Sequence, residues 1–483
     1  MYQELALGPV APGQTLQEWL FREIRSAILD GRLRAGARLP STRSLAVRNQ
    51  LSRSTVTDTF RRLNLEGYIT GKIGSGSYVA QNLPDQYFQP ERRTASVGRA
   101  HSGSQPSWLL PFQPLRKFGA AFQANRPALD LFPIDIWTRL SGRVLRRLSS
   151  SHLAAGDVRG EIELRQEILA HFGPARQVRC DLDQVVVVSG VQHALDLVCR
   201  VWLQPGDTVW LENPGYLGAR NLFLAAGANI APAPVDAQGL QVEHAIESLP
   251  IPKLIYLTPA HQFPTGANLA LDRRVKLLAW ARKHNIIIFE DDYDGDFRFA
   301  TKPLGSVQGL DLGGCVAYCT SFSKLLFPTL RLGFLVLPVQ LVEPILKLRN
   351  STERFQPVPE QKTLAEFMRT GEFGHHVRRM RELYAERWAV LSGAAGRWLD
   401  DWLEVEPAEC GLQTATWLRS GVSDLKIAAL AAREGLEVYP ISTLYAAGKP
   451  RQGFLLGFGA VAPRELRLGA QRLARVLRHA HGQ

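Results

Sequence analysis

Residues 320–333 read Thr320-Ser321-Phe322-Ser323-Lys324-Leu325-Leu326-Phe327-Pro328-Thr329-Leu330-Arg331-Leu332-Gly333. This stretch places one lysine among hydroxyl groups and an arginine seven residues after it. A lysine that forms a Schiff base is held beside an aldehyde, and hydroxyls with a guanidinium suit a phosphate dianion. Lys324 is therefore the best candidate in the chain for covalent chemistry, and pyridoxal 5'-phosphate (PLP) is the ligand that these groups indicate.

A pair of acids follows a second informative segment. Asp291 and Asp292 come after the apolar run Ile286-Ile287-Ile288-Phe289, which has the length and β-branching of a buried parallel strand. Ligand groups in open α/β sheets sit at the carboxyl ends of such strands, and an acid there keeps a pyridine nitrogen protonated. We choose Asp291 for this role, with Asp292 as the alternative, because spacing does not settle which carboxylate points inward.

The remaining strands extend this pattern into an α/β domain. The runs 185–188, 208–211 and 254–257 alternate with helical segments, which predicts a mainly parallel sheet. The first run leads into Ser189-Gly190-Val191-Gln192, a glycine turn that opens a helix, and the backbone N–H groups of such a helix start bind anions.

Three fragments in this order resemble the fold-type I aminotransferase domain of MocR-type regulators. They are residues 259–266 (Pro-Ala-His-Gln-Phe-Pro-Thr-Gly), residues 290–293 (Glu-Asp-Asp-Tyr) and Ser-Phe-Ser-Lys with Arg331. The resemblance runs from about residue 115 to the end of the chain. It implies that PLP forms an aldimine with Lys324, that Tyr216 stacks on the ring and that Tyr293 donates to the 3'-oxygen. It further implies that the phosphate is held by Gly190, Val191, Gln192, Ser321, Ser323 and Arg331.

Two positions depart from ordinary aminotransferases. Phe263 stands where most such enzymes have an asparagine that reaches the cofactor's 3'-oxygen, and Leu455 stands where they have an arginine that binds the substrate carboxylate. A buried charge-assisted hydrogen bond is worth roughly 1.5–3 kcal/mol, so these losses count against transamination. Arg220, or another arginine of the pocket, is the alternative carboxylate ligand.

Residues 15–80 carry eleven basic residues against five acidic ones, a balance of +6 out of the chain's +12. Ser41 and Ser52 are positioned to cap two short helices joined by a tight turn, and glycines at 71, 74 and 76 suit a hairpin. Together these features form a helix-turn-helix with a wing, which resembles the GntR-type winged helix. The resemblance implies DNA contacts at Arg43, Ser52, Arg53, Ser54, Thr55 and Gly74. Ser52 has an alternative role as a helix cap only.

The whole sequence sets further bounds. Its 483 residues exceed the roughly 250–300 at which single cores stop growing, so we expect a winged helix at 12–80, a linker at 81–114 and a PLP domain at 115–483. Five cysteines at scattered positions argue against a disulfide framework, no metal site is expected, and no signal peptide or spanning segment is evident. A cytoplasmic protein fits best.

The resemblance predicts a homodimeric, DNA-binding transcriptional regulator. PLP, an amine or an amino acid would act as effector at Lys324 and alter binding to a double-stranded DNA operator. The sequence leaves two alternatives open. One is an active aminotransferase with an appended DNA-binding domain, and the other is a DNA-binding protein whose large domain is a cofactor-free dimerisation scaffold.

Overall fold

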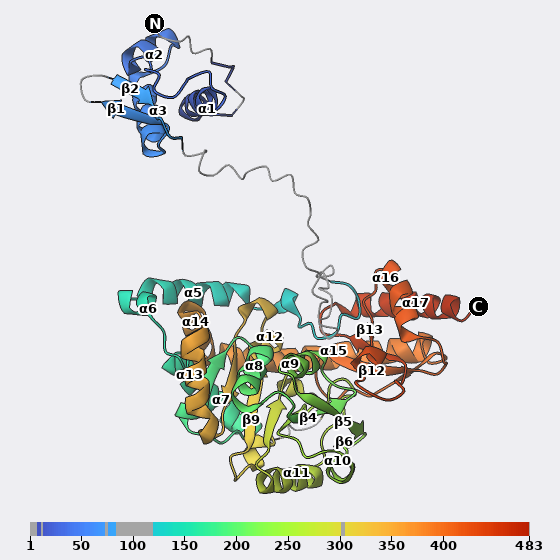
Figure 1. Cartoon of the computed structure of the whole chain (residues 1–483). Coiled ribbons are helices and arrows are strands. Elements are labelled where there is room, and N and C mark those ends of the chain that lie inside the picture. The colour runs from blue at the N-terminus through green and yellow to red at the C-terminus, as the bar shows by residue number, and fades with distance from the viewer. Residues whose placement is uncertain (1–6, 11–12, 73–75, 84–118, 301–304, 483) are drawn as a thin grey trace. The chain divides into compact units, whose positions relative to one another are not determined.

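The computed structural model describes residues 7–10, 13–72, 76–83, 119–300 and 305–482. The chain divides into two units, Met1–Gln105 and Pro106–Gln483 (Figure 1). Most of the predicted linker, residues 84–114, and the wing residue Gly74 lie outside the described residues. Within the described part of the chain, no helix is both long and apolar enough to cross a membrane.

The first unit is a helix-turn-helix followed by a hairpin. Its elements are α1 (Leu16–Leu29), α2 (Thr42–Arg48), α3 (Arg53–Leu65) and the antiparallel strands β1 (Ile69–Lys72) and β2 (Gly76–Val79). The Ser41 hydroxyl accepts from the backbone N–H of Ser44, and that of Ser52 accepts from the N–H of Thr55. Because each cap satisfies an N–H that the helix leaves unpaired, both helices start where the sequence predicts.

The apolar face of α1 packs on α3. Leu20, Ile24, Val56 and Leu63 are almost fully buried in this core. Leu83 is also buried in it, so the packed unit continues three residues past position 80.

The second unit is built on an eight-stranded sheet of order β3-β10-β9-β8-β7-β4-β5-β6. The central strands β9, β8, β7, β4 and β5 pair in parallel, whereas β10 runs antiparallel to β3 and β9, and β6 runs antiparallel to β5. The prediction of a mainly parallel sheet is confirmed. Its strands are β3 (Val185–Val188), β4 (Thr208–Asn213), β5 (Asn229–Asp236), β6 (Gly239–Leu240), β7 (Leu254–Leu257), β8 (Ile287–Asp291), β9 (Val316–Ser321) and β10 (Gly333–Val336).

Helices cover both faces of this sheet, which explains why its strands are apolar throughout. Val186 and Val188 pack with α8, α9 and α13, while Val185 and Val187 pack with α7 and α14 on the opposite face. The covering helices are α5 (Ile134–Arg147), α7 (Ile162–Arg176), α8 (Val191–Trp202), α9 (Leu217–Ala225), α10 (Val242–Ser248), α11 (Leu271–Lys283), α13 (Val339–Thr352) and α14 (Val358–Arg369). The short helix α6 (Ser150–Ala154) follows α5 and buries none of its residues.

The carboxy-terminal part forms a smaller, four-stranded antiparallel sheet of order β11-β12-β14-β13. Its strands are β11 (Leu403–Val405), β12 (Gln413–Leu418), β13 (Tyr439–Pro440) and β14 (Gly453–Gly457), and it packs with α15 (Glu372–Trp398), α16 (Asp424–Arg433) and α17 (Pro463–Ala480) (Figure 1). Phe454 and Leu456 of β14 share one core with α17, whereas Leu455 between them faces the opposite way.

The strand order brings the sequence-predicted site residues to one edge. β3, β8 and β9 end at the same side of the sheet, and β9 continues directly into the four-residue helix α12 (Phe322–Leu325). In register, Gly333 of β10 lies opposite both Val188 of β3 and Ser321 of β9. A Cβ on Gly333 would lie only 2.7 Å from the Thr320 carbonyl oxygen, so this position requires glycine.

Candidate functional site

A cavity of about 200 Å³ lies at this edge of the sheet. All ten residues predicted to hold PLP line it: Gly190, Val191, Gln192, Tyr216, Asp291, Tyr293, Ser321, Ser323, Lys324 and Arg331. Phe263, noted in the sequence as a departure from ordinary aminotransferases, also lines it, and three residues that the sequence did not single out complete the wall: Asn125, Tyr256 and Thr258.

Lys324 projects from α12 into the cavity, and its Nζ donates to the Asn125 carbonyl at 2.8 Å. Burial lowers the pKa of Lys324 to about 8, and the Arg126 cation acts in the same direction, whereas Asp294 and Asp291 oppose the change. A lysine with a lowered pKa holds more of the neutral amine, which is the form that attacks an aldehyde.

Asp291 and Asp292 point in different directions. Asp291, the last residue of β8, accepts from the Tyr256 hydroxyl at 2.5 Å through Oδ2, and it lines the cavity with Lys324. Asp292 accepts from Arg176 Nε and from the Tyr318 hydroxyl, each at 2.7 Å, and it does not line the cavity. Of the two acids, Asp291 is the one placed to meet a ligand.

The Asp291 carboxylate is prepared for a positive partner. Its Oδ1 atom is buried and has no hydrogen-bond partner among the described residues. Burial raises the pKa of Asp291 to about 7, the hydrogen bond from Tyr256 opposes this shift, and the charges of Asp292 and Asp294 add to it. A protonated pyridine nitrogen at Oδ1 would supply the missing donor and favour the ionised acid.

Groups that suit an anion line another part of the same cavity. Gly190 caps α8 with φ 122° and without a side-chain cap, so the first N–H groups of this helix remain available to an anion. The hydroxyls of Ser321 and Ser323 line the cavity beside it, together with Arg331. Within the described residues Arg331 makes no hydrogen bond or ion pair. These groups fit a phosphate.

Aromatic side chains form one wall. The ring of Tyr216, which follows β4, lies 6.2 Å from that of Tyr256 at an angle of 27°, and its hydroxyl accepts from Gln192 Nε2 at 3.2 Å. Burial raises the pKa of Tyr216 to about 12, and Asp291 adds to the shift. Tyr216 therefore remains a neutral, flat surface against which a ring could stack.

Phe263 and Leu455, the two residues that depart from ordinary aminotransferases, pack in one apolar cluster. Leu455 is fully buried and packs with Phe263, Trp417 and Ile441, and Phe263 lines the cavity. Arg220 donates to the Tyr445 carbonyl at 3.1 Å and does not line the cavity. This geometry does not favour Arg220 as the substitute carboxylate ligand, and among the described residues Arg331 is the only arginine that lines the cavity.

Tyr256 shows what sequence reasoning missed. It lies on β7, beside β8, with its ring 5.9 Å from that of Phe289. The available signal was the single polar group in the apolar run Leu254-Ile255-Tyr256-Leu257. A tyrosine inside a strand that is buried on both faces needs a partner for its hydroxyl, and the neighbouring strand supplies Asp291.

The predicted DNA contacts gather at the start of α3 and on α2. Arg43, Ser52, Arg53 and Ser54 are exposed, and Thr55 is half-buried. Ser52 does cap α3, and its hydroxyl also lies 2.8 Å from that of Ser54. The guanidiniums of Arg43 and Arg53 form no hydrogen bond or ion pair with the described residues of the chain, so both are available to phosphate or guanine.

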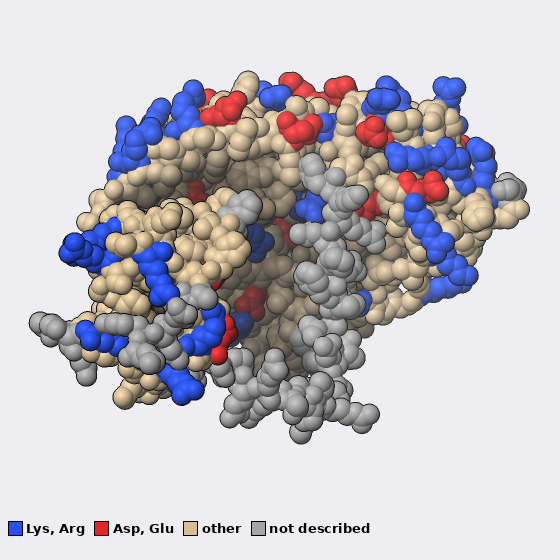
Figure 2. All heavy atoms as spheres, turned by 90° about the horizontal axis from the view of Figure 1, so that it is seen from above, with Lys and Arg blue, Asp and Glu red and all other residues tan. Residues whose placement is uncertain are grey.

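Charge alone would not identify this face. Figure 2 shows basic side chains also on the part of the second unit that carries α16 and α17, where Arg464, Arg467, Arg475 and Arg478 are exposed on α17. The helix-turn-helix geometry, rather than the net charge, assigns the DNA-binding role to the first unit.

Comparison with known proteins assigns each of the two units to a protein family. Residues 16–79 match the family of bacterial regulatory proteins, gntR family, and residues 135–445 match aminotransferase class I and II. The chain is 36% identical over 459 residues to the probable rhizopine catabolism regulatory protein MocR of Rhizobium meliloti, covering 94% of this chain and 92% of that protein. The chain belongs to the MocR-type transcriptional regulators. The family predicted from the sequence is confirmed.

Several aminotransferases are among the solved structures that resemble the large unit of this MocR-type chain. Kynurenine aminotransferase of Pyrococcus horikoshii, in complex with PMP, matches with a TM-score of 0.70 at 26% identity, over 75% of this chain and 91% of that one. LysN, the α-aminoadipate aminotransferase of Thermus thermophilus, is complexed with N-(5'-phosphopyridoxyl)-L-leucine and matches with a TM-score of 0.70 at 25% identity, over 75% and 92% of the two chains. The aminotransferase-like fold of the large unit is thereby confirmed.

Proposed function

We propose that this MocR-type regulator binds PLP as an internal aldimine at Lys324 and controls DNA binding through it. The observation that carries the proposal is the cavity itself, which is lined by Lys324, by Asp291 with its unpartnered Oδ1 and by Gly190 at the start of α8. An aldehyde, a pyridine nitrogen and a phosphate are the three groups that these partners suit, and PLP carries all three.

The effector in this proposal is PLP itself, an amine or an amino acid that displaces Lys324 from the cofactor. Such a ligand acts only if it binds two conformations of the large unit with different affinity, so that the DNA affinity of the winged helix changes in turn. Resemblance to fold-type I proteins supports a homodimer, which would present two winged helices to a double-stranded operator.

The test measures DNA affinity with and without the cofactor. A labelled duplex from the intergenic DNA beside the gene is titrated with the wild-type protein and with Lys324→Ala, each in the presence and absence of PLP. We expect PLP to change the Kd of the wild type and to leave that of Lys324→Ala unchanged. Equal changes in both proteins would overturn the role of Lys324, and no change in either would overturn PLP as a regulator.

A working aminotransferase is the second candidate. Lys324, Asp291 and Tyr293 in one cavity favour it, whereas the apolar pair Phe263 and Leu455 counts against it. Single-turnover mixing of the PLP-loaded protein with amino acids distinguishes the two. A regulator would bind the amino acid without releasing keto acid, whereas an enzyme would release it.

A further inference from the structure

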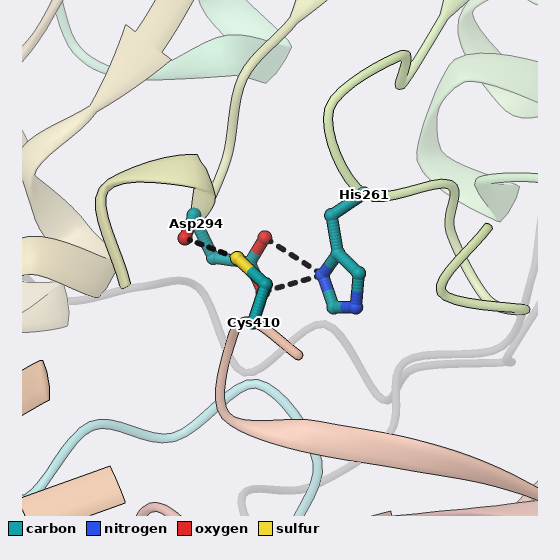
Figure 3. Close-up of side chains that lie close together, drawn as sticks. All are labelled: His261, Asp294 and Cys410. Atoms are coloured by element: carbon teal, nitrogen blue, oxygen red, sulfur yellow. Dashed lines mark hydrogen bonds and ion pairs between the residues drawn. The ribbon is translucent and has the colours of Figure 1, made fainter. Parts of the chain in front are cut away.

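Three buried side chains next to the cofactor cavity come together from three segments of the chain: His261, Asp294 and Cys410 (Figure 3). Their polar atoms lie within 4.8 Å of one another. His261 Nδ1 is 2.9 and 3.0 Å from the two carboxylate oxygens of Asp294, and it is also 3.0 Å from the hydroxyl of Tyr293. Tyr293 in turn lines the cavity with Lys324.

The chemistry of this group is that of a hydrogen-bonded cluster. Burial raises the pKa of Cys410 well above its usual value, and the Asp294 charge adds to the shift, so its sulfur is a thiol. That thiol donates to the Asp294 carbonyl at 3.4 Å. The guanidiniums of Arg298 and Arg176 act on the same sulfur, and two such cations disfavour a metal ion there.

The partners of His261 fix its tautomer. A carboxylate can only accept a hydrogen bond, so Nδ1 must carry a proton that it donates to Asp294. An Nδ1–H group has no lone pair to offer, and the Tyr293 hydroxyl therefore cannot donate its hydrogen to His261. Burial, with Asp294 adding to its effect, raises the pKa of Tyr293 well above the usual value, so the hydroxyl keeps that hydrogen.

We infer that His261 and Asp294 are positioning residues, which hold Tyr293 so that its hydroxyl donates into the cavity, to the 3'-oxygen of the cofactor. This inference rests on the proposed binding of PLP at Lys324. Phe263 stands where most aminotransferases have a second donor to that oxygen, so Tyr293 is the donor that the cavity retains. A donor at the 3'-oxygen withdraws negative charge from it and lowers the pKa of the imine nitrogen.

The test is a pH titration of the imine absorbance of the full-length, PLP-loaded protein. In Asp294→Asn, the carboxylate that holds the proton on Nδ1 is gone, so the tautomer with an unprotonated Nδ1 becomes accessible, as the wrong tautomer does in an Asp-His pair. The Tyr293 hydroxyl can then donate to the Nδ1 lone pair and turn away from the cavity. We expect the imine pKa to rise by roughly one pH unit, as in Tyr293→Phe, because a hydrogen bond to a charged oxygen is lost. Loss of the Asp294 charge alone would lower it, which is the opposite sign.

His261 offers a matched pair of variants. The amide of His261→Asn can replace the donor near the Nδ1 position, so the imine pKa should stay at the wild-type value. His261→Gln moves the amide one carbon further and should raise the pKa. Cys410→Ser keeps a donor to the Asp294 carbonyl and serves as the packing control, with no shift expected. Asp291 and Glu212 also act on the pKa of Tyr293, and both are the same in every variant.

An unchanged or lowered imine pKa in Asp294→Asn and His261→Gln would overturn the positioning role while leaving PLP binding intact. If Asp294→Asn does not retain PLP, the imine pKa values of His261→Asn and His261→Gln test the positioning role instead. A shift of equal size in His261→Asn and His261→Gln would also overturn it, because packing rather than the Nδ1 donor would then be responsible. A wild-type protein without an imine band would instead reject the proposed function.

Discussion

The hydroxyl of Tyr256 donates to Oδ2 of Asp291 over 2.5 Å, while the second oxygen of this carboxylate is buried without a hydrogen-bond partner among the described residues. One oxygen of Asp291 is thus hydrogen-bonded, and the other is available to a ligand. Burial raises the pKa of this acid to about 7. Such a group gains most from a cationic partner, since a buried charge is costly unless it is paired. A protonated pyridine nitrogen is a partner of that kind.

Asp291→Asn is therefore expected to weaken PLP retention and to change the imine spectrum, because an amide does not hold the pyridine nitrogen protonated. The measurements are the Kd for PLP and the absorbance spectrum of the loaded variant. A wild-type spectrum and affinity in Asp291→Asn would refute the assignment of the pyridine partner.

Asp292→Asn is the matched control on the adjacent residue. Asp292 pairs with Arg176 inside the protein, and both side chains are only 1% exposed. Breaking such a pair leaves a buried charge and costs roughly 3–5 kcal/mol. We expect Asp292→Asn to have a lower Tm and an unchanged imine spectrum. If instead the spectrum changes in Asp292→Asn and stays that of the wild type in Asp291→Asn, the roles of the two acids are exchanged.

The stability of the cofactor-free protein should depend on Asp291 in a defined pH window. Its pKa is raised from 3.8 to about 7 in the folded state, so between these values the native protein binds a proton that the unfolded chain has lost. Stability from this group is then greatest at low pH and decreases as pH rises to 7, by at most about 4 kcal/mol. Thermal unfolding from pH 5 to 8 should show the wild type losing stability relative to Asp291→Asn.

Adding PLP should reverse this trend, because the pyridinium charge favours the ionised acid. Burial also raises the pKa of Glu212 and of Glu290 to about 7, and both contribute equally to wild type and variant. The difference in stability between the two proteins therefore reports on Asp291 together with its effect on the pKa of Lys324. A difference that is constant from pH 5 to 8 would show that the Asp291 pKa is not raised.

How much of the structure could be predicted from the sequence differs from residue to residue. The buried strand at Val185–Val188 and the capped helices at Ser41 and Ser52 were predictable because periodicity and capping are local. The choice between Asp291 and Asp292 was not, since it depends on Arg176, which is 116 positions away from Asp292. The His261–Asp294 pair could not be predicted for the same reason, because its geometry depends on how two loops pack.

The DNA-binding face should be separable from the cofactor site. Arg53→Ala removes an exposed guanidinium at the start of α3 and should weaken operator binding, with PLP affinity unchanged. Each phosphate contact adds roughly 0.9 to the slope of log Kd against log salt, so losing one should reduce that slope by about this amount. Fluorescence anisotropy across a salt series measures both quantities.

Arg62→Ala is the control on the same helix. Its guanidinium already pairs with Glu66 at 2.8 Å and lies over the ring of Phe21, 3.9 Å from the centroid. Because these partners occupy it, the salt slope should remain that of the wild type. Equal slopes in Arg53→Ala and the wild type would reject the proposed docking of α3.

The last prediction concerns turnover. Leu455 lies inside an apolar cluster with Phe263 and Trp417, so the carboxylate of an amino acid finds no guanidinium at this position. An unanchored carboxylate leaves the substrate poorly aligned, and a misplacement of about 1 Å can cost 10²-fold in rate. We expect amino acids to bind to the PLP-loaded protein while complete transamination is slow or absent, as measured by keto acid release over many turnovers. Rapid conversion of a common amino acid, near the roughly 10 s⁻¹ median of enzymes, would instead establish an aminotransferase with a DNA-binding unit attached.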